Sequence, residues 1–184
     1  MTSKRLTPEH VHAVGVAAIE NAIDLMADAA TLLEAGRPRR AYAIGVIAVE
    51  ELAKFNTCRT ALRDWNEPLT VAQLNGLLKP AGRSHVRRYA DTLVYLSALG
   101  SLGGNWPERL EELGAMAKQD QLARQWALYV EVSPSGEPLT PARVTDAEAS
   151  DWVSGMVRWF SMLAPTVWRD GIDEELASAQ AKPS

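Results

Sequence analysis

Cysteine and histidine are scarce in this sequence. Its 184 residues contain one cysteine, Cys58, and three histidines. A single thiol excludes an intramolecular disulfide and a cysteine-based metal knuckle. There is no His-Glu-x-x-His pair and no glycine-rich phosphate loop, so neither metal catalysis nor a nucleotide cofactor is supported. We therefore expect no metal and no cofactor, and Cys58 is expected to be a small buried apolar residue.

A surplus of positive charge and a long apolar run are also missing. The formal net charge of -4 argues against a protein that coats nucleic acid by bulk charge, so any such contact would need a local basic patch. The longest apolar stretch, AYAIGVIAV at residues 41–49, is too short to span a bilayer. The first ten residues lack the apolar core of a signal peptide. We expect a cytoplasmic protein with no membrane partner.

Helix signals dominate what is present. Thr7 can cap a helix whose first residue is Pro8, and Gly36 can end it. A second helix is predicted from Pro38 to about Trp65. The short link at Gly36 makes the two an antiparallel hairpin, which is the basic unit of an up-and-down bundle.

The rest of the chain continues this pattern with one exception. Capping boxes at Thr70–Gln73 and Thr145–Glu148 predict two more helix starts, and Pro165 is expected to kink or end the second of these helices. Further helices are predicted over 85–99 and 107–126, and extended structure near residues 127–144. The prediction is an all-α bundle with a small hairpin insertion, as one domain over 1–176 and a disordered tail over 177–184.

Three charged residues end the most hydrophobic helix. Glu50, Glu51 and Lys54 lie with Arg40 on a narrow stripe of a helix that is otherwise apolar on most sides. Lys54 can pair with Glu50 at i,i+4 or with Glu51 at i,i+3. The pattern fits two interpretations: a surface salt-bridge cluster, or a half-buried polar seam between helices.

The order of several short motifs resembles the AbiV family of bacterial abortive-infection proteins. The first motif elements are Asn21, Asp28-Ala29, Gly36 and the Ala48–Lys54 segment with its Ala-x-Glu-Glu-x-x-Lys pattern. Two later segments, SHVRRYADTL and RQWALYVEV, are similar to a His-x-x-Lys helix start and an Arg followed by Leu-Tyr-Val-Asp in that family. The resemblance runs from Asn21 to Val132.

The resemblance implies a phage-defence protein with a HEPN-like fold. HEPN domains commonly form homodimers and often act as metal-independent ribonucleases, with an Arg four to six residues before a His. His85 is the matching histidine, but Leu78, Lys79 and Pro80 stand where the arginine should be, so only Lys79 could substitute. A formal match from Arg5 to the histidines at 10 and 12 lies away from the family position and is interpreted as chance.

Metal-independent RNA cleavage requires proton transfer and positive charge at the phosphate. We predict His85 and Arg88 as catalytic groups, with Glu51 and Lys54 beside them. The predicted RNA-binding residues are Lys79, Arg83 and Arg87, and the predicted supporting residues are Glu50, Asn21 and Asp28. The expected partners are a second copy of the chain, RNA (tRNA, mRNA or ribosome-associated) and a phage protein that acts as trigger.

A different class of function fits the missing arginine. In this alternative the protein is a non-enzymatic helical module that binds a phage protein or the translation machinery. The tryptophans at 152, 159 and 168 recur close to helical spacing with apolar neighbours. This pattern favours core packing or a dimer surface over base stacking.

Overall fold

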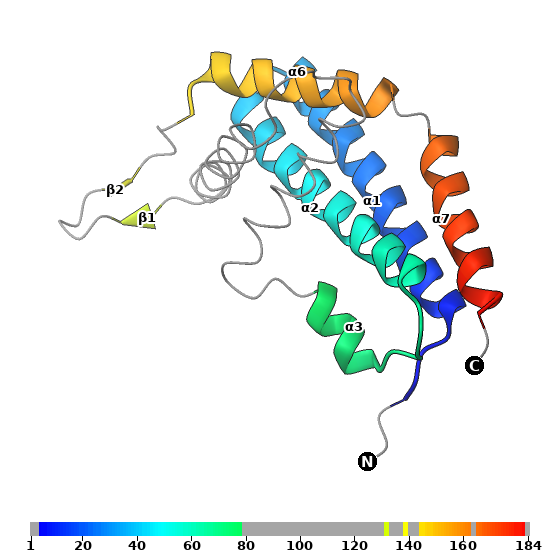
Figure 1. Cartoon of the computed structure of the whole chain (residues 1–184). Helices are drawn as coiled ribbons and strands as arrows, with labels where there is room; N and C mark the ends of the chain where they lie inside the picture. The colour runs from blue at the N-terminus through cyan, green and yellow to red at the C-terminus, as the bar shows by residue number, and fades with distance from the viewer. Residues whose placement is uncertain (1–3, 79–130, 133–137, 140–143, 163–164, 183–184) are drawn as a thin grey trace, which may run out of the picture.

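The computed structural model describes residues 4–78, 131–132, 138–139, 144–162 and 165–182. In these ranges the chain forms a helical bundle with a two-stranded hairpin (Figure 1). The elements are α1 (Pro8–Glu34), α2 (Pro38–Arg63), α3 (Val71–Leu78), β1 (Glu131–Val132), β2 (Pro138–Leu139), α6 (Asp146–Met162) and α7 (Pro165–Gln180). The all-α prediction is confirmed. The helices predicted over 85–99 and 107–126 lie outside the described residues.

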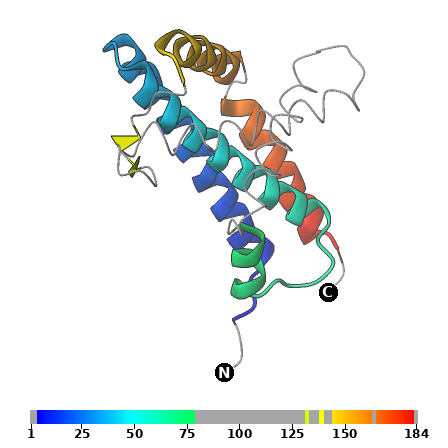
Figure 2. The same cartoon turned by 90° about the vertical axis from the view of Figure 1, so that its left-hand side faces the viewer.

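The α1–α2 hairpin is the centre of the bundle. As predicted, Pro8 begins α1 after Thr7, whose N–H donates to His10 Nδ1 at 3.2 Å. Gly36 follows α1 with a φ of 68°, a conformation that glycine adopts without the steric cost of a Cβ atom. The chain then reverses into α2, which lies alongside α1 in both views (Figures 1 and 2).

Both predicted capping boxes are present. The Thr70 N–H donates to Gln73 Oε1 at 2.7 Å, and the Gln73 N–H donates to Thr70 Oγ1 at 3.2 Å. At the start of α6, the Thr145 N–H donates to Glu148 Oε2 at 2.8 Å, and the Glu148 N–H donates to Thr145 Oγ1 at 3.2 Å. Each box satisfies backbone N–H groups that have no partner within the helix.

α6 and α7 cover the hairpin. α6 lies across the end of the hairpin that contains Gly36, and α7 returns along α1 toward the other end (Figures 1 and 2). As predicted, the Trp-rich helix ends near Pro165: α6 stops at Met162, and Pro165 begins α7. Side-chain contacts from α7 to α1 include His12–Asp173, Glu20–Arg169 and Glu9–Gln180.

The tryptophans contribute to the core, and core packing was one of the two interpretations that their spacing favoured. The ring centroids of Trp152 and Tyr42 are 4.8 Å apart, and those of Trp168 and Phe55 are 5.5 Å apart. Trp168 is 3% exposed, which leaves no ring face for a stacked base. A Cβ at Gly45 would lie 2.6 Å from Trp152 Cζ3, so the missing side chain makes room for the indole.

A second glycine allows a tighter contact where α1, α2 and α7 meet. Gly15, Cys58 and Ile172 form this closed contact, and both side chains are 0% exposed. A Cβ added at Gly15 would overlap Ile172 Cδ1 and lie 3.0 Å from Cys58 Cβ. As predicted, Cys58 is a buried residue. Loss of hydration raises the pKa of its thiol from 9.0 to about 12.

The first described residues hold α3 against the bundle. The Leu6 N–H donates to the Leu69 carbonyl at 2.6 Å, and the Val71 N–H donates to the Lys4 carbonyl at 3.3 Å. Arg5 and Thr70 form an antiparallel bridge between these two bonds. The residue before α3 therefore pairs, like a strand, with the segment before α1.

Extended structure occurs where the sequence predicted it. β1 and β2 pair antiparallel, with Glu131 opposite Leu139 and Val132 opposite Pro138. At the other end of the chain, α7 runs to Gln180, beyond residue 177 where a disordered tail was expected to begin. The helix continues because Ala179, 3% exposed, packs into the apolar core.

Candidate functional site

The α1–α2 interface leaves a pocket at the predicted polar seam. Counted from Gly36, Asn21 and Glu51 lie the same number of residues away along the two antiparallel helices, so they face each other across the hairpin. Lys54 lies one helical turn further along α2. The described residues that line this seam pocket are Val14, Ala17, Ala18, Asn21, Glu51, Lys54 and Leu78.

Burial distinguishes the two interpretations of the charged residues. The Lys54 ammonium donates a hydrogen bond to Glu51 Oε1, which confirms the i,i+3 pairing. The Glu51 side chain is 15% exposed and that of Lys54 is 37% exposed. A surface salt-bridge cluster would leave both side chains in water, so the half-buried polar seam is the better description.

The pocket combines polar groups with apolar walls. The Glu51 carboxylate and the Lys54 ammonium hold opposite charges beside each other, and the Asn21 amide can both donate and accept. A fixed carboxylate can orient a histidine, and a fixed ammonium can attract a phosphate. Together, these three groups can support proton transfer on an anionic substrate.

Two other predicted residues do not line the seam pocket. Glu50 is partly buried at the position before Glu51. Asp28 is exposed on α1, two turns from Asn21 on the same side of the helix. The structure therefore brings Asn21, Glu51 and Lys54 together, and it places Asp28 nearer the Gly36 end of the hairpin.

The remaining predicted site residues lie outside the described residues. These are Lys79, Arg83, His85, Arg87 and Arg88. The first described range, 4–78, ends at Leu78, which lines the seam pocket. His85 follows Leu78 by seven residues, so the covalent chain keeps their Cα atoms within about 25 Å.

The three residues of the formal arginine–histidine match near the N-terminus make contacts of their own. His10 Nδ1 accepts the Thr7 N–H at the start of α1, and His12 Nε2 contacts Asp173 Oδ1 of α7 at 2.5 Å. Arg5 lies in the bridge to Thr70. These contacts serve the helix start and the packing of α7.

Sequence reasoning missed the apolar half of the seam pocket. Val14, Ala17, Ala18 and Leu78 form its walls. The first three could have been found by pairing residues across the hairpin about Gly36, since Ala18 stands opposite Lys54. Leu78 could not, because the return of α3 toward α1 depends on the pairing at Arg5 and Thr70.

A family model described as AbiV (HEPN_AbiV) matches residues 10–158, most of the chain. The chain belongs to the AbiV family. The matched range contains the seam pocket residues of α1, α2 and α3 as well as the segment with His85 and Arg88. No curated protein and no solved structure matches the sequence.

The described helices of this AbiV-family chain were also compared with the length and the apolar character that a bilayer span requires, and its acidic, histidine and cysteine side chains with the spacing of a metal site. None of the described helices is both long and apolar enough to cross a bilayer. In the same part of the chain, His, Cys, Asp and Glu side chains do not gather in groups of three that could hold a metal ion.

Proposed function

We propose that this AbiV-family protein is an abortive-infection effector in the cytoplasm that acts on RNA or translation by metal-independent RNA cleavage. The observation that carries the proposal is the seam pocket. A carboxylate, an ammonium and an amide are held there on two rigid helices, at the point where the chain leads into the segment with His85. Family membership supplies the link to phage defence.

Each group has a role in the proposed reaction. His85 transfers a proton between the ribose 2′-hydroxyl and the leaving oxygen, and Arg88 stabilises charge on the phosphate. Lys54 adds positive charge, while Glu51 and Asn21 orient these groups. Lys79, Arg83 and Arg87 bind the RNA backbone, and Glu50 and Asp28 support the two helices. The proposed active form is a homodimer, activated by a phage protein.

The experiment compares growth and RNA ends in cells that express the wild type, His85→Ala or Lys54→Ala. The wild type is expected to arrest growth and produce new RNA ends, and both variants are expected to lose both effects. Arg158→Ala is the matched control, since it removes an exposed cation from α6. If growth arrest persists in His85→Ala and no strain shows new RNA ends, the cleavage mechanism is wrong.

The alternative is a non-enzymatic helical module that binds a phage protein or the translation machinery. Its specific support is the absence of an arginine four to six residues before His85. It predicts arrest without new RNA ends, and co-purification of the wild type with ribosomes or a phage protein. Mass photometry of the purified protein tests the homodimer independently of either mechanism.

A further inference from the structure

Three arginines surround a second pocket at the turn between α1 and α2. The arginine turn consists of residues 36–40, Gly-Arg-Pro-Arg-Arg, in a chain whose formal net charge is -4. These five residues line the pocket together with Asp146 of α6. Arg37 and Arg40 are exposed, so their guanidinium groups can meet a ligand from solution.

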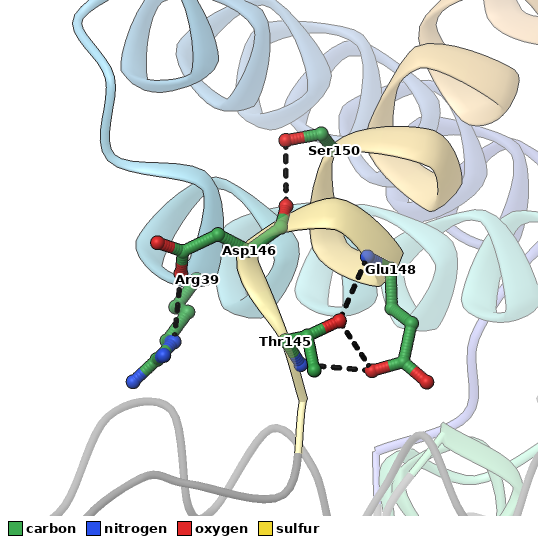
Figure 3. Close-up of polar contacts among 5 residues, drawn as sticks. All are labelled: Arg39, Thr145, Asp146, Glu148 and Ser150. Atoms are coloured by element: carbon green, nitrogen blue, oxygen red, sulfur yellow. Dashed lines mark hydrogen bonds and ion pairs between the residues drawn. The ribbon is translucent and has the colours of Figure 1, made fainter.

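The third arginine pairs with an aspartate of α6. Arg39 Nε lies 2.8 Å from Asp146 Oδ1, and its terminal nitrogens point away from that carboxylate (Figure 3). The contact is an ion pair and not a hydrogen bond. The buried Nε has no hydrogen-bond acceptor among the described residues. Asp146 is itself fixed at the start of α6, where its carbonyl accepts from Ser150 Oγ at 2.7 Å. An oriented guanidinium with outward-facing donors matches the geometry of a phosphate group.

The start of α2 adds weaker attraction for an anion. Its N-cap residue, Arg37, makes no side-chain capping bond, and its first turn contains no acidic residue. The backbone N–H groups of Arg39 and Arg40, in this first turn, have no partner within the helix and lie at its positive end. The end of α1, with Glu34, lies beside it and offsets part of this dipole. The arginine side chains thus provide most of the attraction.

Arg40 of the arginine turn and Glu51 of the seam pocket lie on one side of α2. Arg40 and Glu51 are eleven residues apart. At about 100° and 1.5 Å per residue they differ by only about 20° in direction and about 16 Å in height.

We propose that the arginine turn binds phosphate groups of single-stranded RNA, whose backbone follows this side of α2 to the seam pocket. The proposal rests on the proposed function, because it names how an RNA substrate is held away from the reacting phosphate. Arg37 and Arg40 make the exposed contacts, and Arg39 presents its outward-facing donors beside them. The remaining length of the strand leads toward Lys54.

The test measures binding of a labelled single-stranded RNA of about 12 nucleotides by fluorescence anisotropy. All proteins carry His85→Ala so that the probe stays intact. The Arg37→Ala/Arg40→Ala variant is expected to bind about tenfold more weakly, with a salt dependence lower by about 0.7 per lost phosphate contact. Arg63→Ala/Arg158→Ala, which removes two exposed arginines elsewhere, is the matched control and is expected to bind normally.

Three results would overturn the proposal: unchanged binding by the Arg37→Ala/Arg40→Ala variant, an equal loss in the control, or displacement of the RNA by adenosine monophosphate at equal nucleotide concentration. The last would assign the pocket to a free nucleotide. Failure here is distinguishable from failure of the proposed function. New RNA ends in cells together with arginine-independent binding would refute only this inference, whereas arginine-dependent binding without RNA ends would refute only cleavage.

Discussion

The α1–α2 interface is closed at Gly15 and open at Asn21, although these residues are only six positions apart on α1. At Gly15 the two helices and α7 pack so closely that a Cβ atom has no room. At Asn21 the same two helices leave the seam pocket, lined by an ion pair and an amide. The distance between the two regions is about 9 Å along the helix.

The difference shows how one hairpin can provide both stability and a site. In the closed contact α7 supplies Ile172, and the buried residues exclude water. At the seam pocket Leu78 is the described contribution from a third helix, and charged groups keep partial contact with solvent. The apolar contact fixes the spacing of the helices, so the polar groups next to it are preorganised without having to stabilise the fold themselves.

The largest expected effect concerns the chemistry of the closed contact. Because burial raises the pKa of Cys58 from 9.0 to about 12, its thiolate fraction near pH 8 falls about a thousandfold. A thiol reagent is expected to react with Cys58 only after denaturation. The measurement is the absorbance of released thionitrobenzoate with and without guanidinium chloride. Reaction of the native protein at the rate of an exposed thiol would show that this contact is open.

Filling the closed contact should destabilise the protein. Gly15→Ala is expected to lower the free energy of unfolding by about 2 kcal/mol, since the new methyl group overlaps Ile172 Cδ1. Gly155→Ala is the matched control, because a Cβ at this helical glycine meets nothing within 4 Å. The control is expected to gain about 0.5–1 kcal/mol from helix propensity alone. Urea unfolding monitored by circular dichroism gives all the values.

A second substitution, at Ile172, should recover part of the stability that Gly15→Ala loses. Ile172→Val removes the Cδ1 atom that overlaps the new methyl group. Gly15→Ala/Ile172→Val is therefore expected to be more stable than the sum of the two single changes, by about 1 kcal/mol. Additive losses would mean that Cys58, whose Cβ lies 3.0 Å from the added Cβ, and not Ile172, limits the space at this position.

Changing the seam pocket should lower activity much more than it lowers stability. Lys54→Met removes a charge whose side chain is 37% exposed, so solvent screening limits the loss of stability to about 1 kcal/mol. The loss of growth arrest in cells is expected to be complete. Thermal melts and growth curves of the same variant separate the two effects. A variant that melts far below the wild type would show that the pair holds the fold together.

The smallest effect lies at the edge of the closed region, where α7 reaches the start of α1. Hydrogen bonds from Thr7 and Gln180 lower the pKa of Glu9 from 4.5 to about 2. A lowered folded-state pKa stabilises the protein above the unfolded value, and this contribution is lost as the pH falls from about 4.5 to about 2. Glu9→Gln should flatten the pH dependence of the melting temperature in this window. An unchanged slope would contradict the prediction.

The local features of the fold could be predicted from the sequence. The helix starts at Pro8 and Pro38 and the two capping boxes depend on residues at most a few positions apart. The i,i+3 pair of Glu51 and Lys54 follows from helix geometry in the same way. The resemblance to the AbiV family added the HEPN-like fold.

Contacts between distant segments could not be predicted in this way. A glycine inside a helix indicates close packing, but nothing near Gly15 or Gly45 indicates Ile172 or Trp152 as the neighbour. The ion pair between Arg39 and Asp146 joins residues more than a hundred positions apart. The three arginines of the arginine turn could therefore be read from the sequence. The pairing of Arg39 with α6 could not.

The bridge between Arg5 and Thr70 has a practical consequence for work on this protein. Because α3 is held by the residues just before α1, a change in the first segment of the chain acts on Leu78 and so on one wall of the seam pocket. We expect a bulky affinity tag before this bridge to disturb the region that binding and activity assays aim to measure. Purification tags and fluorescent labels are better placed after α7.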